Sequence, residues 1–300
     1  MFALPIGVLF AVTIITLYLK VTLGGVFSKE ISKDSSYYTW YFTFIQNMFC
    51  LIGIVLIFLV SGGFKTFSYP TLLLGIILGF AHVFCLAFVM KAYAIGPFSY
   101  TTIITSLSCV IPALSGLFFG ETITLFQYIG ILFMIVCLVL STEKTEDDKK
   151  KKKGAKWFAF TIISTLSSGV VGIVQKTHQS ITQCKSEMPL LLISSFIVAT
   201  LISFIKFKCE KKDENIVIKN KNILYLLPII SGVFFAFPHT INLFLAGKVD
   251  AVIMFPLVNL CPLLVIMITG IVIFKEKLTK SQWIGVVFGL ASTILVSGIF

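Results

Sequence analysis

The feature that most constrains this chain is a series of long apolar segments separated by short polar ones. Each is close to the roughly 20 apolar residues that a helix needs to cross a bilayer. The alternation typical of barrel strands is absent, so the sequence predicts an all-α integral membrane protein. We place ten spanning helices, at residues 4–27, 38–60, 71–93, 98–118, 123–142, 157–176, 187–206, 223–246, 251–274 and 281–299.

The composition excludes a soluble enzyme and a nucleic-acid-binding protein. Of the 300 residues, 57% are hydrophobic and 12% are charged, whereas soluble domains have about 25% charged residues. All 24 basic residues are Lys and none is Arg, although Arg makes most specific base contacts. We therefore expect the lipid bilayer as a partner and no nucleic acid.

Catalytic and cofactor motifs are missing from the sequence. The seven cysteines form no Cys-x-x-Cys pair, and no Gly-rich loop of the kind that binds ATP phosphates is present. The acidic residues are scattered, without the cluster that would hold a metal in a membrane enzyme. We expect no enzyme activity, no metal and no cofactor.

The two halves of the chain resemble each other. Residues 10–15 return as 158–163, and His82 has a counterpart in His239. A third match, with identical spacing, pairs Glu121, Gln127, Tyr128, Ile129 and Gly130 with Glu276, Gln282, Trp283, Ile284 and Gly285. These matches predict a five-helix unit at residues 1–142, a Lys-rich loop at 143–156, and a second five-helix unit at 157–300.

An odd number of helices in each unit has a consequence for orientation. The second unit must enter the membrane with the opposite orientation to the first, which makes the two units inverted repeats. Inverted repeats are the architecture of many secondary transporters, in which two similar halves expose a central site to each side in turn.

The motifs at the ends of the two units resemble a known family. Gly120-Glu121 before Gln127–Gly130, Lys275-Glu276 before Gln282–Gly285, and the segment 92–97 are similar to the ten-helix EamA-like members of the drug/metabolite transporter superfamily. The resemblance covers essentially the whole chain. It implies a transporter and says nothing about the substrate.

The lysines predict a topology that differs from the one the resemblance implies. The loops that follow the odd-numbered segments carry 19 of the 24 lysines. By the positive-inside rule these Lys-rich loops are cytoplasmic. Both termini of this multi-pass cell-membrane protein would then lie outside the cell, whereas the resemblance implies that both lie inside.

Polar side chains within apolar segments are the candidate substrate-binding residues, because they are costly in lipid. His82 and His239 lie at equivalent places in the two halves, and Pro238 would break the helix beside His239. Lys20 either pairs with an anionic group in a cavity or extends toward the Lys-rich side of the membrane. We select six such residues: His82, His239, Asn242, Asn259, Lys20 and Gln46.

Other polar and small residues have structural interpretations. Glu121 and Glu276 each precede a helix, where a carboxylate caps free N–H groups. The pair Gly75 and Gly79 has the spacing of close-packed membrane helices, and such motifs would also serve a homodimer. Thr101, Thr102, Thr105 and Asn47 would either line a cavity or join helices.

The sequence therefore predicts a secondary transporter that is not driven by ATP. Its partner would be a small polar metabolite, such as an amino acid, moved by alternating access. A proton coupled through a histidine is a candidate driving ion, because the histidine pKa lies near physiological pH. The alternatives are a membrane scaffold or receptor without transport, and a lipid-handling membrane protein.

Overall fold

The fold is built from helices alone wherever it is described. The structure is a computed structural model that describes residues 5–32, 35–60, 67–140, 148–181, 184–212, 221–259 and 279–296, and within these ranges no strand occurs. The predicted all-α class is therefore confirmed.

The first half contains the helices expected from the sequence, with one helix divided into short pieces. The bounds are α1 Ile6–Phe27 with a π-helical turn at Ser28–Ser32, α2 Ser36–Val60, α3 Tyr69–Ile95, α4 Phe98–Ser106, a 3-10 turn at Leu107–Cys109, α5 Val110–Ser115, a 3-10 turn at Gly116–Phe119, and α6 Leu125–Leu140. Together α4 and α5 form the predicted fourth segment.

The second half begins earlier than the sequence suggested. The bounds are α7 Asp148–Ser180, a 3-10 turn at Lys185–Glu187, α8 Met188–Cys209, α9 Lys221–Ala246, and α11 Lys280–Val296. Residues 251–259 are also helical. The Lys-rich segment was expected to be a loop up to residue 156, but α7 starts at Asp148, because lysine favours helices.

Seven described helices are long and apolar enough to cross a membrane. These candidate spans are Ile6–Ile31, Ser36–Val60, Tyr69–Ile95, Tyr100–Phe119, Gly154–Ser180, Lys185–Cys209 and Asn222–Ala246. Helices α6 and α11, at the fifth and tenth predicted segments, have 16 and 17 residues. The ninth predicted segment, 251–274, is described only as far as residue 259, so the count of ten remains a prediction.

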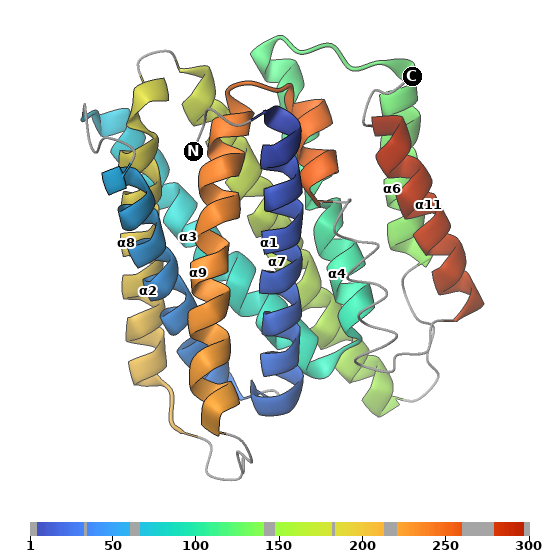
Figure 1. Cartoon of the computed structure of the whole chain (residues 1–300). Coiled ribbons are helices and arrows are strands. Elements are labelled where there is room, and N and C mark those ends of the chain that lie inside the picture. The colour runs from blue at the N-terminus through green and yellow to red at the C-terminus, as the bar shows by residue number, and fades with distance from the viewer. Residues whose placement is uncertain are drawn as a thin grey trace.

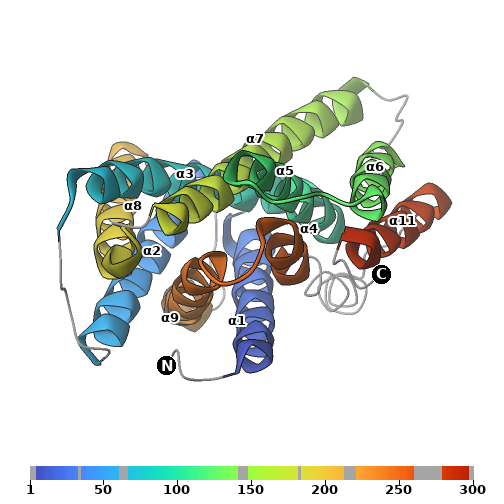
Figure 2. The ribbon, with the colours of Figure 1, turned by 90° about the horizontal axis from the view of Figure 1, so that it is seen from above.

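Helices of the first half pack on helices of the second half, and the contacts occur in corresponding pairs. Helix α1 packs on α9, and α7 packs on α3, while α2 contacts both α8 and α9 and α3 contacts α8. Helices α4 and α5 lie along α7, and α6 pairs with α11 at one side of the molecule (Figures 1 and 2). The N-terminal end of α1 and the C-terminal end of α11 lie at the same end of the bundle (Figure 1).

The glycine pair Gly75 and Gly79 makes the predicted close contact. A Cβ atom at Gly79 would lie 2.5 Å from the carbonyl oxygen of Ser195 and 2.8 Å from Cβ of Val198, both on α8. A Cβ at Gly75 would overlap the hydroxyl of Ser194. The small residues therefore let α3 approach the backbone of α8, as close membrane-helix packing requires.

Proline acts differently in the two halves. Pro112 lies one turn after Ser108 and leaves that carbonyl without its helical donor, and the fourth segment changes to a 3-10 turn at Leu107–Cys109. The expectation that Pro238 breaks its helix is wrong, because α9 continues past it to Ala246. Proline is tolerated inside membrane helices where neighbouring helices compensate for the freed backbone group, and α9 packs on both α1 and α2.

Candidate functional site: a polar cavity between the halves

A cavity of about 170 Å³ lies inside the bundle. Its walls come from α1, α2, α3, the α4–α5 segment, α7, α9 and residues 251–259, so both halves contribute. It is larger than the roughly 150 Å³ cavity that accommodates benzene in an engineered protein. The six residues selected from the sequence all line it: Lys20, Gln46, His82, His239, Asn242 and Asn259.

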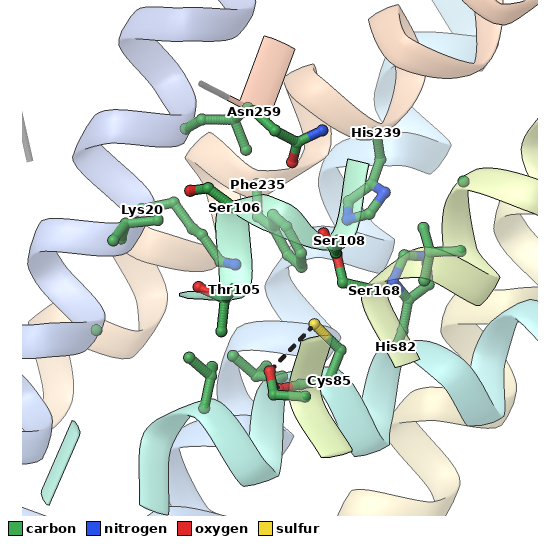
Figure 3. A pocket seen from close by; sticks show the side chains of 18 of the residues that line it. Lys20, His82, Cys85, Thr105, Ser106, Ser108, Ser168, Phe235, His239 and Asn259 are labelled. Carbon is green, nitrogen blue, oxygen red and sulfur yellow. Dashed lines mark hydrogen bonds between the residues drawn. The ribbon is translucent and has the colours of Figure 1, made fainter. Parts of the chain in front are cut away.

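The two selected histidines lie in direct contact on one side of the cavity. The ring centroids of His82, on α3, and His239, on α9, are 4.2 Å apart with the planes at 86°. The ring of Phe196 stacks on His82 at 4.9 Å, and Phe235 lies 4.1 Å from His239. The rings of Phe196, on α8, and Phe235, on α9, therefore pack against the two imidazoles and restrict their orientation. Figure 3 shows His82, His239 and Phe235 at the cavity.

Lys20 enters the cavity from α1 on the other side. Its ammonium lies over the ring of Phe235, 4.3 Å from the centroid, and Figure 3 shows the side chain extending from α1 toward that ring. Because Phe235 lies near the middle of α9, Lys20 points across the bundle and does not extend along α1 toward the Lys-rich side. The Lys20 side chain therefore lines the cavity, and its pairing with an anionic group stays a prediction.

Several buried polar atoms around the cavity have no hydrogen-bond partner within the described part of the chain. They include both amide atoms of Gln46, both ring nitrogens of His239, Nε2 of His82, Oδ1 of Asn242 and Nε2 of Gln175. Gln46 is completely buried, and His82 is 4% exposed. Buried polar groups are normally satisfied, so this arrangement is suited to a polar solute or water in the cavity.

A row of hydroxyl groups that the sequence analysis did not select forms another wall. The Oγ of Ser108, in the 3-10 turn of the first half, donates to the Oγ of Ser168 on α7 of the second half at 2.9 Å. Ser164 donates to the backbone carbonyl of Cys85 at 2.9 Å. The sequence did contain one signal for Ser168. The repeated segments that begin at residues 10 and 158 are 148 positions apart, and the same offset makes Ser168 the counterpart of Lys20.

The other polar candidates divide between the cavity and helix contacts. Thr102 and Thr105 line the cavity. Thr101 does not, because its hydroxyl accepts a hydrogen bond of 2.8 Å from the indole N–H of Trp157. Asn47 is buried and also lies outside the lining. Periodicity within one helix does not separate these cases, since neighbouring helices decide which face meets the cavity.

Glu121 caps a helix, but not the one that follows it in sequence. Its Oε2 accepts a 2.8 Å hydrogen bond from the backbone N–H of Ala251, at the start of the helix 251–259. Its Oε1 lies 2.5 Å from the ammonium of Lys176, at the end of α7, in a nearly buried ion pair. Glu121 therefore joins the first half to the second. Its counterpart Glu276 lies outside the described residues.

Comparisons with known proteins now identify the family. The model of the EamA-like transporter family matches residues 5–142 and again residues 155–298, one match for each half. The chain belongs to the EamA-like transporter family. It is accordingly a multi-pass membrane protein from a family of transporters in the drug/metabolite transporter superfamily.

The remaining comparisons concern the fold. A solved structure described only as "Crystal structure of protein" superposes with a TM-score of 0.64 at 12% identity, covering 96% of this chain and 97% of that one. The EamA-like protein therefore shares its overall fold with an experimentally determined structure. Curated proteins gave no significant match.

Proposed function

We propose that this protein is a secondary transporter that moves a small polar metabolite, such as an amino acid, by alternating access. The observation that carries the proposal is the cavity, which is lined by Gln46, His82 and His239. Polar atoms of these three side chains have no hydrogen-bond partner among the described residues. Solute sites at the interface between repeats, near the membrane midplane, are typical of secondary transporters.

The packing of the helices supports two five-helix units, residues 1–142 and 157–300, related by inversion. In such units every contact has a counterpart when the halves are exchanged. The contact of α1 with α9 corresponds to that of α7 with α3, and the contact of α2 with α9 corresponds to that of α8 with α3. This reciprocity is the pattern expected of ten helices in two repeats.

A pair of lysines supports the same correspondence at the level of side chains. At the end of the first helix of one half, the ammonium of Lys29 donates to the carbonyl of Gly96 at 2.6 Å. At the end of the first helix of the other half, the ammonium of Lys176 donates to the carbonyl of Val249 at 3.4 Å. Each carbonyl precedes the fourth helix of its own half.

The ion pair between Glu121 and Lys176 has a role in this proposal. It links the segment before α6 to α7 and, through Ala251, to the helix 251–259. We infer that it closes one end of the cavity in this conformation. Opening that end requires the halves to separate there, which is the motion that alternating access needs.

The proposal also covers the driving ion of the transporter, its orientation in the membrane and its assembly. A proton bound by His82 or His239 is the proposed driving ion. The Lys-rich loops face the cytoplasm and both termini the outside of the cell membrane, in accordance with Lys206 and Lys208 in the last turn of α8. A homodimer would form through lipid-facing helices.

A two-stage experiment tests the function. Purified protein is screened by thermal denaturation against the twenty amino acids, short carboxylic acids and simple sugars, because a solute that binds the folded state raises the Tm. Solutes that stabilise the protein are then tested for uptake into proteoliposomes without ATP. Uptake above that of empty vesicles supports a transporter, whereas binding without uptake supports a receptor or scaffold.

A further inference from the structure

The charge of the cavity narrows the class of solute. Lys20 is the one charged side chain among the described lining residues. No acidic residue lies among them, and the sequence of residues 260–274, which follow Asn259, contains no Asp or Glu. In the described part of the chain, the ammonium of Lys20 contacts the ring of Phe235 and forms no ion pair.

An isolated ammonium within the bilayer is energetically costly, and such charges are normally paired. The ring of Phe235 compensates it only in part, since a cation–π contact contributes about 0.5–2 kcal/mol. The described residues therefore supply no negatively charged partner for Lys20, and the cavity next to its ammonium is the place where a solute would supply one.

We propose that the cavity binds a small organic anion with a single carboxylate, whose charge is met by the Lys20 ammonium. This proposal rests on the transport function proposed above and names the class of its substrate. One ammonium matches one carboxylate, whereas a dianion such as a phosphate monoester would leave a negative charge unpaired. The chain contains no Arg, the residue suited to bidentate phosphate binding.

The remaining walls fit the rest of such a solute. Hydroxyls of Thr105, Ser106 and Ser108, and the imidazoles of His82 and His239, provide hydrogen-bonding groups for an oxygen substituent (Figure 3). Because the described lining residues include no acid that could pair with an ammonium, an amino acid would leave its own positive charge next to Lys20 and the histidines. The predicted order of affinity is therefore carboxylate above neutral amide, amino acid and amine.

Four molecules of equal size test the predicted order of affinity on the wild-type protein. Lactate is an anion, lactamide is neutral, alanine is a zwitterion and alaninamide is a cation. Inorganic phosphate serves as the dianion. The Tm of the purified protein is measured as a function of each concentration at constant ionic strength. Lactate is expected to raise the Tm at concentrations at least about tenfold lower than the other four.

A matched pair of variants tests the role of Lys20. Lys20→Met removes the charge within the cavity, and Lys248→Met removes one at an exposed position. Lys20→Met is expected to weaken lactate binding by at least about 30-fold, because a buried charge pair loses one partner. Without solute, Lys20→Met is expected to raise the Tm, since the unpaired charge is gone. Lys248→Met is expected to change neither quantity.

The outcomes separate this inference from the proposed function. Stabilisation by lactate that Lys20→Met retains overturns the inference, as does stronger stabilisation by any of the other molecules. A fall in the Tm of solute-free Lys20→Met would make Lys20 a structural residue and would also overturn it. If alanine or lactamide binds instead and is taken up by proteoliposomes, the transport function stands while the anion inference fails.

Discussion

The imidazole rings of His82 and His239 lie with their centroids 4.2 Å apart and nearly perpendicular, although 157 positions separate them in the sequence. They come from the third helix of each predicted repeat and meet at the wall of one cavity. A contact between equivalent residues of two related halves places the cavity where the halves meet, and the account of function depends on that position.

The histidine pair is predicted to contribute to solute binding. The double substitution His82→Ala and His239→Ala removes the ring nitrogens that face the cavity without partners in the described structure. We expect the affinity for the most stabilising solute of the thermal screen to fall at least about tenfold, the effect of losing one hydrogen bond of about 1.4 kcal/mol. The measurement is the concentration dependence of the Tm.

His178, the third histidine of the chain, provides a control for the double substitution. His178 is buried at the end of α7, with its ring nitrogens near Thr71 and Gln179, and it does not line the cavity. His178→Gln is expected to lower the Tm and to leave the affinity unchanged. Equal losses of affinity in His178→Gln and in the double variant would show that the histidines act through stability alone.

The ion pair between Glu121 and Lys176 is predicted to stabilise the conformation seen here. Glu121→Gln leaves the nearly buried Lys176 ammonium without its carboxylate partner, and the expected cost is about 3–5 kcal/mol, seen as a fall of several degrees in the Tm. The double variant Glu121→Gln with Lys176→Met removes both charges and is expected to recover part of the loss.

A variant at an exposed acid controls for the loss of negative charge. Glu30 is exposed, so Glu30→Gln is expected to change the Tm by little. Strictly additive effects of Glu121→Gln and Lys176→Met would contradict the interaction, because two residues in one ion pair are expected to be coupled.

The close packing of α3 on α8 predicts a strong effect at Gly79. Gly79→Ala places a methyl group against the backbone carbonyl of Ser195, which forces α8 to move, and overpacking of this kind costs roughly 1–3 kcal/mol. Gly7→Ala is the matched control, because no atom lies within 4 Å of a Cβ at Gly7. If both variants melt at the wild-type temperature, the two helices do not approach this closely.

The predicted orientation of the chain is tested by thiol labelling. A cysteine is added after Phe300 in a Cys209→Ser variant, and intact cells are treated with an impermeant thiol reagent. We expect labelling, because the positive-inside rule places the termini outside. The native Cys209 is exposed at the end of α8 on the Lys-rich side, so in the unmodified chain it should label only after permeabilisation. The reverse pattern would place both termini in the cytoplasm.

The sequence predicted the helices well because lipid imposes a simple rule. A segment of about 20 apolar residues must satisfy its backbone internally and becomes a helix, so residues 38–60 and 71–93 correspond closely to α2 and α3. The start of α7 was missed because a change from apolar to polar residues indicates the edge of the lipid, and a helix can continue beyond that edge. Lysines after Asp148 are hydrophilic yet favour helix.

The cavity was only partly predictable. Lys20, Gln46 and His82 could be selected because a polar side chain in an apolar segment is rare. Ser108 could not, since serine is common in membrane helices, and for Ser168 the one signal was its offset of 148 from Lys20. The contact of the two serines depends on how α7 packs on the α4–α5 segment. Glu121 was expected to cap the helix that follows it, but it caps the helix 251–259 through Ala251 of the other half, and only the tertiary structure brings these two residues together.

The most direct test of the account is whether the cavity opens to each side of the membrane in turn. Thr105, in the cavity lining, is replaced by Cys in a variant whose native cysteines are Ser. A charged, impermeant thiol reagent is then applied to right-side-out and to inside-out vesicles. A Cys at the exposed, lipid-facing Leu201 is the unreactive control. Alternating access predicts modification of Thr105→Cys from both sides. Modification from one side only, or from neither, would contradict it.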